Sequence, residues 1–404
     1  MSLPIENKTL IRAPAYAVRY VPGGLVALDP ATPHWIATDQ RGLKLLPHFD
    51  GQTPFDQIVR DYASETGLDV TKAWLHAETF AHDGLRHGFL SVDTAAPPPY
   101  LGRSAYLELE QLQELWIQVN DFCNLRCEHC LVSSGPEREQ GLPTERLIDA
   151  IDQAAGLGVE RLFFTGGEPL ARPDIFKLIE QVVTVHGCEL VILTNGTLFS
   201  RERLKRLGPF ARKQQSSIVR ADDDQGSGGK GGTLRIQVSL DGPTDEINDP
   251  IRGKGSFQRI VDGLDAAVNA GIQPTLTTTI VNHNIDHVGE IVRLASEHGV
   301  GNVHLLWPHR RGRVLDGALA ALPTAEQILC AVRQARAVAA DLGVSIDNLE
   351  EFRLRLDGSP GVKNDLAGAG WSSLCLSTDG WIYPSASMAG VAELRCGDLT
   401  EQSL

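Results

Sequence analysis

The alternation of strand and helix patterns between about residues 113 and 315 is the feature that most constrains this fold. Apolar runs of strand length take turns with amphipathic stretches of helical period. Strands separated by helices pair in parallel through right-handed crossovers, so six such units predict an open, partial barrel. The expected strands are residues 114–119, 161–166, 189–195, 233–241, 273–281 and 302–307. The expected helices include residues 144–156, 174–185, 257–270 and 286–298.

The first 98 residues follow a different pattern, with a small hairpin that turns at Pro22-Gly23-Gly24 and three short helices after it. We expect Thr53 to cap one of these helices and Pro54 to take its first position. Another helix is expected over about residues 70–87, and a closing strand over residues 87–92. This combination predicts a small winged-helix-like α+β domain.

The chain therefore divides into five expected parts around an α/β, partial (β/α)6 TIM-like barrel. They are a winged-helix-like domain at 1–98, a proline-rich linker at 99–112, the partial barrel at 113–315, a helical connection at 316–369 and a short β-hairpin extension at 370–404. Residues 211–232 are charged and rich in glycine and serine, which favours a surface insertion within the barrel.

The charge and the cysteine usage exclude several classes of function. A formal net charge of −14 argues against a nucleic acid or an anionic membrane surface as the main partner. The chain has no apolar run of membrane-spanning length and no secretion signal at its start, so we expect a cytoplasmic protein. Cysteines in a reducing compartment are more often metal ligands or catalytic groups than disulfides. Cys188 and Cys330 stand alone in apolar contexts and are expected in the core.

Three cysteines lie directly after the first expected barrel strand, at Cys123, Cys127 and Cys130. Thiolates are the ligands of iron–sulfur clusters, and three of them would leave one iron of a four-iron cluster open to a chelating small molecule. A zinc site is the alternative, with His129 or Cys188 as its fourth ligand.

Polar and glycine residues also follow the next strands, where the carboxyl ends of parallel strands meet. Gly166 and Gly167 end the second strand and allow a close backbone approach, and Glu168 adds an acceptor. A plain β-to-α turn is the alternative interpretation. Asn195 ends the third strand, and Ser239 and Asp241 end the fourth with their side chains on one face.

These motifs resemble those of the radical S-adenosylmethionine (radical SAM) enzymes, in the expected order over about residues 115–310. The stretch CNLRCEHC is similar to the family's C-x3-C-x2-C signature, FFTGGEPL to its GGEP motif, and residues 237–257 to a further family segment. The resemblance implies a [4Fe–4S] cluster on Cys123, Cys127 and Cys130, with S-adenosylmethionine bound beside it.

The same resemblance implies roles for the remaining candidates. His129 would lie near the adenine, the Gly166-Gly167-Glu168 turn would bind the amino group of the methionine moiety, and Asn195 would line the cofactor rim. Ser239 and Asp241 would suit the ribose hydroxyls. Arg252 would pair with the methionine carboxylate, with a surface salt bridge as the alternative.

The C-terminal extension resembles the start of a SPASM or twitch segment, in which Cys375 and Cys396 align with two ligands of an auxiliary iron–sulfur cluster. Ser385 stands where that family usually has a further cysteine, and two thiolates are too few for an ordinary cubane. We therefore expect a truncated form or a lost auxiliary cluster. A cluster completed by Ser385 or an external ligand, and two plain buried cysteines, remain alternatives.

The N-terminal domain resembles the small chaperone of pyrroloquinoline quinone biosynthesis, which implies recognition of a leader peptide by residues 1–98. The expected function is thus that of a radical SAM enzyme that abstracts hydrogen from a ribosomally made peptide, leading to a thioether, a carbon–carbon crosslink or an epimerised residue. A flavodoxin or ferredoxin is the expected electron donor. One alternative is a radical SAM enzyme for a small molecule or a metal-cofactor precursor. Another is a non-catalytic peptide-binding metal protein.

Overall fold

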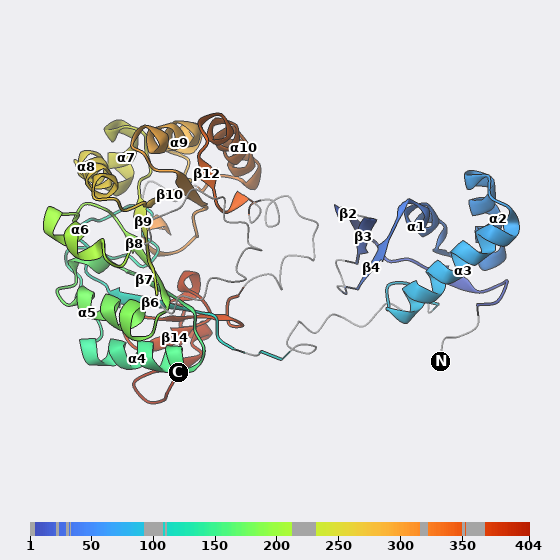
Figure 1. Cartoon of the computed structure of the whole chain (residues 1–404), viewed down its shortest axis with the longest axis horizontal. Helices are drawn as coiled ribbons and strands as arrows, with labels where there is room; N and C mark the ends of the chain where they lie inside the picture. The colour runs from blue at the N-terminus through green and yellow to red at the C-terminus, as the bar shows by residue number, and fades with distance from the viewer. Residues whose placement is uncertain are drawn as a thin grey trace. The chain divides into compact units, whose positions relative to one another are not determined.

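The computed structural model describes residues 5–21, 24–29, 32, 34–92, 108–109, 111–211, 232–315, 322–349, 352 and 368–404. Among these residues, one compact unit ends at Glu108 and a second begins at Leu109. Figure 1 shows both units.

The N-terminal unit contains two small antiparallel sheets and three helices (Figure 1). Strands β2 (Ala17–Val21), β3 (Gly24–Leu28) and β4 (Trp35–Thr38) form one sheet in that order, and β1 (Leu10–Arg12) pairs with β5 (Asp50–Pro54). The helices are α1 (Gln40–Leu45), followed by a 3-10 turn at Leu46–His48, α2 (Phe55–Thr66) and α3 (Val70–Arg86).

A separate hydrophobic core holds this unit together, with Phe49, Phe55, Tyr62 and Phe80 among its buried side chains. The expected hairpin is confirmed, since Val21 pairs with Gly24, although the turn residues 22–23 lie outside the described residues. The expected helix at 70–87 is confirmed as α3.

Two details of this unit were predicted wrongly. Thr53 and Pro54 belong to β5, and α2 begins at Phe55, because Pro54 has an extended backbone and pairs with Leu10. Residues 87–92 form no regular strand, because the N–H groups of Phe89 and Leu90 bond back to the carbonyl of Gly84 at the end of α3. Ser91 forms an isolated bridge to Arg12, which is too short to count as a strand.

The second unit is built on a ten-stranded sheet in the order β12-β11-β10-β9-β8-β7-β6-β13-β14-β15. Its parallel centre consists of the six expected strands, β6 (Glu114–Asn120), β7 (Arg161–Gly166), β8 (Glu189–Thr194), β9 (Leu234–Ser239), β10 (Thr275–Thr279) and β11 (Asn302–Leu306). This arrangement confirms the partial barrel. The short β12 (Ser345–Ile346) continues it in parallel.

Helices follow the strands and cover the outer face of the sheet (Figure 1). They are α4 (Thr144–Gly156), α5 (Ile175–Glu180) with a π-helical turn at Gln181–Val185, α6 (Arg201–Leu207), α7 (Asp245–Arg252), α8 (Ser256–Asn269), α9 (Val288–Glu297) and α10 (Ala325–Leu342). Alternate strand residues such as Leu115, Ile117 and Leu162 are fully buried in the core. Their neighbours Trp116 and Phe163 point to the other face, where their rings stack at 3.9 Å between centroids.

The C-terminal extension, residues 370–404, forms the expected hairpin and also joins the main sheet. Strand β13 (Ser373–Leu376) adds to β6 in parallel, and β14 (Trp381–Tyr383) and β15 (Gly397–Asp398) follow antiparallel. The Thr378 hydroxyl donates to Asp121 Oδ2 at 2.8 Å, just after β6. The extension is therefore packed beside the segment that carries the three cysteines.

The remaining expectations on organisation have mixed outcomes. Cys188 is buried as expected, but Cys330 is exposed, because it faces away from the apolar side of α10. Most of the linker and of the glycine-rich insertion lies outside the described residues, as do residues 350–351 and 353–367 of the expected helical connection. The domain boundaries therefore stay predictions. None of the helices in the described residues is both long and apolar enough to span a membrane.

Candidate functional site

The three cysteines lie on the segment of residues 121–135 that follows β6, here called the cysteine loop. Cys123 is buried, and Cys127 and Cys130 are half-buried. Backbone N–H groups point at two of the sulfurs, from Leu125 to Cys123 Sγ at 3.4 Å and from Ser134 to Cys130 Sγ at 3.3 Å. Donors of this kind are the outer contacts that tune thiolate ligands.

Burial raises the pKa of Cys123 to about 11 and that of Cys127 to about 12. Both thiols therefore keep their protons in the protein alone, and metal binding would have to displace them. Three thiols on one loop, with N–H donors behind two of them, fit a cluster held by three protein ligands.

In this structure, neither residue expected as the fourth ligand of a zinc site is available to the three cysteines. The ring of His129 is paired with Asp241, and Cys188 comes just before β8, at the opposite end of the strands from the cysteine loop. Among the described residues, no three cysteine, histidine or carboxylate side chains converge as a single metal ion requires, and this includes the three thiols of the cysteine loop. The four-ligand zinc site is therefore disfavoured.

The glycine turn at the end of β7 packs against the backbone of the cysteine loop. Gly166 has a positive φ of 114°, and a Cβ at Gly167 would overlap the carbonyl oxygen of Phe122. The N–H of Gly167 donates to Asn120 O at 2.7 Å, and that of Glu168 to Phe122 O at 2.8 Å. The close backbone approach expected here is thus made to the chain itself, and it fixes the two loops against each other.

Glu168 is 1% exposed, and both of its carboxylate oxygens accept hydrogen bonds. Oε1 accepts from the N–H of Leu170 at 2.9 Å and from the Thr194 hydroxyl at 2.7 Å, and Oε2 accepts from the N–H of Asn195 at 2.7 Å. Burial raises the pKa of this carboxyl, and the three donors oppose the rise. Glu168 therefore joins the ends of β7 and β8, and Oε2 keeps a lone pair for a further donor.

Asn195 connects this turn to the cysteine loop. Its side-chain amide donates to Asn124 Oδ1 at 2.9 Å and contacts Cys123 Sγ at 3.8 Å. From the sequence, Asn195 was expected only at the rim of the cofactor site. Asn120 was not predicted as a site residue, although its side-chain amide donates to the carbonyl of Glu168 at 3.0 Å. Only the position of Asn120 at the end of the first barrel strand pointed to it.

Asp241 is fully buried and pairs with two candidate residues. Its Oδ2 lies 2.5 Å from Nε2 of His129 and 2.6 Å from Nε of Arg252, and its Oδ1 accepts from the N–H of Thr279 at 2.8 Å. Burial by itself raises the pKa of Asp241, but the charge of Arg252 and then His129 outweigh it and lower the pKa to about 2. Asp241 is therefore an anion between two positively polarised groups.

Arg252 is 5% exposed, and the salt bridge that it makes with Asp241 is buried and not on the surface. Its carbonyl oxygen accepts a long hydrogen bond from Cys127 Sγ, at 4.0 Å. Ser239 lies half-buried at the end of β9, two residues before Asp241, as the strand pattern predicts. The end of β9 and the end of α7 thus meet the cysteine loop from one side.

The two cysteines of the C-terminal extension lie on either side of β14 and differ in burial. Cys375 is fully buried in an apolar group with Tyr383 and Ala389, and this burial raises its pKa to about 12. Cys396 is exposed, and its backbone N–H bonds across to Ile382 on β14, the strand that separates it from β13. Ser385 is paired with Ser387 at 3.0 Å between hydroxyls. The loss of the auxiliary cluster therefore stays a prediction.

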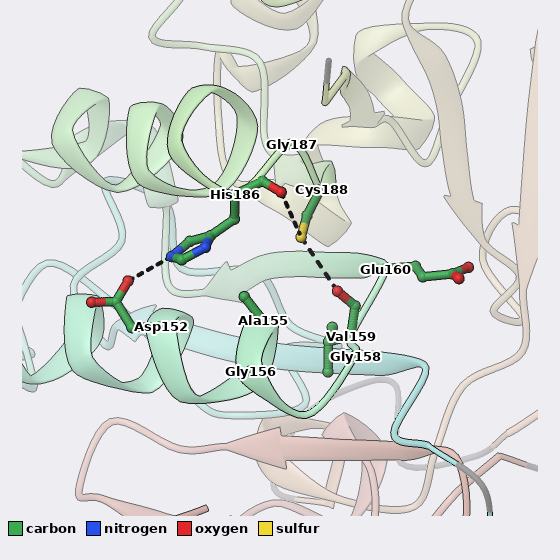
Figure 2. A pocket seen from close by; sticks show the side chains of 9 residues that line it. All are labelled: Asp152, Ala155, Gly156, Gly158, Val159, Glu160, His186, Gly187 and Cys188. Atoms are coloured by element: carbon green, nitrogen blue, oxygen red, sulfur yellow. Dashed lines mark hydrogen bonds and ion pairs between the residues drawn. The ribbon is translucent and has the colours of Figure 1, made fainter. Parts of the chain in front are cut away.

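An open hollow of about 540 Å³ lies elsewhere, at the start of β7 and β8 (Figure 2). Figure 2 shows the Cys188 thiol pointing at the carbonyl of Val159, to which it donates at 3.3 Å, and His186 paired with Asp152 at 2.6 Å. Burial raises the pKa of Cys188, so its thiol is not an activated nucleophile. This hollow is remote from the cysteine loop and has no part in the candidate site.

Comparisons with known proteins find similarity in the part of the chain that forms this site. Residues 117–212 and 229–295 match the model of the radical SAM superfamily, and these residues include the cysteine loop, the glycine turn and Asp241 with Arg252. Mycofactocin maturase MftC of Mycolicibacterium smegmatis is 32% identical over 207 residues, which are 51% of this chain and 47% of that protein. The AdoMet-dependent heme synthase of Methanosarcina barkeri is 32% identical over 193 residues, which are 47% of this chain and 49% of that protein.

The chain thus spans about half the length of the curated relatives that it matches. The crystal structure of Streptococcus suis SuiB bound to the precursor peptide SuiA is similar over 97% of this chain and 87% of that chain, with a TM-score of 0.57. The identity is 14%, so this likeness concerns the fold.

Proposed function

We propose that this chain, which carries a radical SAM domain at residues 117–212 and 229–295, is a radical SAM enzyme. Its [4Fe–4S] cluster would be held by Cys123, Cys127 and Cys130. S-adenosylmethionine would be bound by His129, Gly166, Gly167, Glu168, Asn195, Ser239, Asp241 and Arg252. When bound, the two groups supply the one-electron chemistry that abstracts hydrogen from a substrate carbon.

One observation carries this proposal, namely that a single loop bearing three thiols is fixed on two sides by buried polar networks. Glu168 orders one side through Asn195, and Asp241 orders the other through His129. Such preorganisation holds reacting groups in place at no cost during the reaction. A buried surround also limits the access of water to reactive species.

The substrate that we propose is a ribosomally made peptide whose leader binds the N-terminal unit. A similar protein is named as a maturase, and a protein with a similar fold was solved with its precursor peptide. The three-stranded sheet of this unit has two edges, β2 and β4. Each carries an exposed aromatic side chain, Tyr20 at 71% and Trp35 at 57%. An extended peptide can add to such an edge through backbone hydrogen bonds and use aromatic residues as anchors.

A second candidate function is the modification of a small molecule or cofactor precursor. The similarity to a heme synthase, at the same 32% identity as the maturase, favours it. For either function, we propose a flavodoxin or ferredoxin as electron donor. We also propose a cytoplasmic location, because the cysteines are all free in the described residues and exposed thiols persist in reducing compartments.

The enzyme activity can be tested after anaerobic reconstitution with iron and sulfide. The wild-type protein should bind about four irons and, with a reductant, release 5′-deoxyadenosine from S-adenosylmethionine. Cys127→Ala should lose both properties. The matched control is Cys330→Ala, because Cys330 is exposed on α10 and should be dispensable. Cleavage of S-adenosylmethionine by Cys127→Ala would contradict the assignment of this chain as a radical SAM enzyme.

The peptide substrate can be sought with the full chain as bait in a lysate of the source cells, followed by mass spectrometry of bound polypeptides. Enrichment of one short peptide, lost in Trp35→Ser or Tyr20→Ser, would support a maturase. Val70→Ser is the matched control, because Val70 is similarly exposed, at 54%, but lies on α3. Equal capture by all variants would contradict the sheet-edge proposal, and no captured peptide would favour the small-molecule candidate.

A further inference from the structure

Residues Arg311, Gly312 and Arg313, here called the 311–313 segment, lie shortly after β11 and begin the 3-10 turn Gly312–Leu315. No sequence motif points to them. In the structure, however, they contact two parts of the chain that are distant in sequence, namely the cysteine loop and the C-terminal extension.

Arg313 makes three hydrogen bonds to carbonyl oxygens of the cysteine loop. Its backbone N–H donates to Cys130 O at 3.0 Å, its Nη1 donates to Cys127 O, and its Nη2 donates to Ser134 O at 2.6 Å. A guanidinium has a rigid fork of donors, which suits it to hold two carbonyls at once. All three acceptors are backbone atoms, so the thiols stay free for ligation.

Gly312 is required for this contact. Its φ is +62°, and a Cβ there would overlap the carbonyl oxygens of Cys130 and Leu131. The backbone of the 311–313 segment thus lies directly against the cysteine loop at the third cysteine and the residue after it, at a distance that only glycine permits.

Arg311 points to the C-terminal extension instead. Its two terminal nitrogens donate to the carbonyl oxygens of Ser387 and Ala389. The Thr378–Asp121 hydrogen bond is a second contact of the extension, at the start of the cysteine loop. The extension therefore touches the loop directly at one end and through the 311–313 segment at the other.

We propose that the 311–313 segment is a clamp that couples the C-terminal extension to the cysteine loop, with Arg313 as the positioning residue for Cys127 and Cys130. This inference rests on the proposed function in one respect only, that the loop holds an iron–sulfur cluster. An ordered loop has already lost the conformational entropy that cluster binding would otherwise cost. The cation of Arg313 also favours the reduced cluster, which carries one more negative charge.

The first test compares Arg313→Gln and Arg313→Lys with Arg310→Gln. Arg310 is a matched control because it is exposed and lies three positions before Arg313, just outside the 311–313 segment. In the metal-free full chain, amide hydrogen exchange over residues 124–134 should be faster in Arg313→Gln and unchanged in Arg310→Gln. Unchanged exchange over β7 to β9 shows that each variant is folded.

In the reconstituted protein, Arg313→Gln should lose iron to a chelator about tenfold faster or more, the usual effect of removing an outer contact of a metal site. Its cluster should have a lower reduction potential in an EPR titration, and Arg313→Lys should keep the wild-type potential because it keeps the charge. Iron loss and exchange equal to those of Arg310→Gln would overturn the role of Arg313.

The second test uses Arg311→Gln in the metal-free full chain. Coupling predicts faster exchange both at residues 385–390 and in the cysteine loop, whereas a change confined to the extension would overturn the coupling. A wild-type protein that takes up no cluster would contradict the proposed function. The exchange measurements would still decide whether the clamp exists, so the two failures are distinguishable.

Discussion

His129 and Asp241 lie 112 positions apart in the sequence and meet with 2.5 Å between Nε2 of the ring and Oδ2 of the carboxylate. The same oxygen lies 2.6 Å from Nε of Arg252. Because His129 stands between the second and third cysteines, this contact ties the cysteine loop to the end of β9. Asp241 is thus a structural junction of the site, whatever it contributes to binding of a ligand.

Asp241→Asn should lower the free energy of unfolding of the barrel by about 3–5 kcal/mol, because it leaves the buried Arg252 without its counter-ion. Urea denaturation followed by circular dichroism measures this. Asp265→Asn is the control, since Asp265 also pairs with a histidine but is 46% exposed, and its loss should cost less than about 1 kcal/mol. Equal effects of the two variants would contradict the junction.

The stability difference between the wild type and Asp241→Asn should depend on pH. The pKa of Asp241 is lowered from 3.8 to about 2, with the charge of Arg252 and then His129 outweighing the effect of burial. Since a lowered carboxyl pKa stabilises the fold only while the group is ionised, the contribution is complete above about pH 4 and is lost as the pH falls through about 2. The free energies of unfolding of the wild type and Asp241→Asn should therefore converge as the pH is lowered from about 4 to about 2. A difference between the two proteins that stays constant over this pH range would contradict the lowered pKa.

Gly167→Ala should disrupt the packing of the glycine turn on the cysteine loop, because the added Cβ overlaps the carbonyl oxygen of Phe122. We expect a loss of stability of about 1–3 kcal/mol, as for other overpacked sites, together with reduced iron uptake. Gly156→Ala at the end of α4 meets no atom within 4 Å and should be neutral or slightly stabilising. Iron analysis after reconstitution and thermal denaturation test both variants.

Glu168→Gln should weaken binding of S-adenosylmethionine while leaving the iron content near that of the wild type. The three donors that face this side chain would meet one amide oxygen and one NH2 group, so at least one donor loses its acceptor at a cost of about 1–3 kcal/mol. Isothermal titration with the reconstituted protein measures the affinity. Loss of iron with unchanged affinity would show that Glu168 serves the cysteine loop instead.

The sequence predicted the barrel well because its strands are short apolar runs between amphipathic helices, and this pattern depends on local residues alone. It also placed Cys123, Glu168 and Asp241 just after strands of one parallel sheet, and parallel strands bring their carboxyl ends to the same edge. The sequence could not predict which side chains pair with one another. That Asp241 pairs with both His129 and Arg252 depends on how α7 packs against the cysteine loop, which no periodicity reveals.

The errors have the same physical origin. Pro54 has local preferences for a helix start, but its pairing with Leu10 holds it in a strand. Cys330 has apolar neighbours in sequence, yet its side of α10 faces outward. Arg313 has no motif at all, and its three carbonyl contacts appear only when the chain after β11 folds back on the cysteine loop. Long-range contacts decided each case.

Phe55→Ala should destabilise the N-terminal unit selectively. Phe55 is fully buried in the separate core of that unit, and its ring packs edge-on against Trp74 at 5.2 Å between centroids. Removing a buried phenylalanine costs about 3–5 kcal/mol, a large part of the stability of a domain this small. Leu75→Ala is the control, because Leu75 is 62% exposed on α3 and its loss should cost less than about 0.5 kcal/mol.

Amide hydrogen exchange in the full chain should accelerate across α2 and α3 in Phe55→Ala while β6 to β9 stay protected, because the barrel strands are buried in a core of their own. Acceleration of both units together would show that they unfold as one.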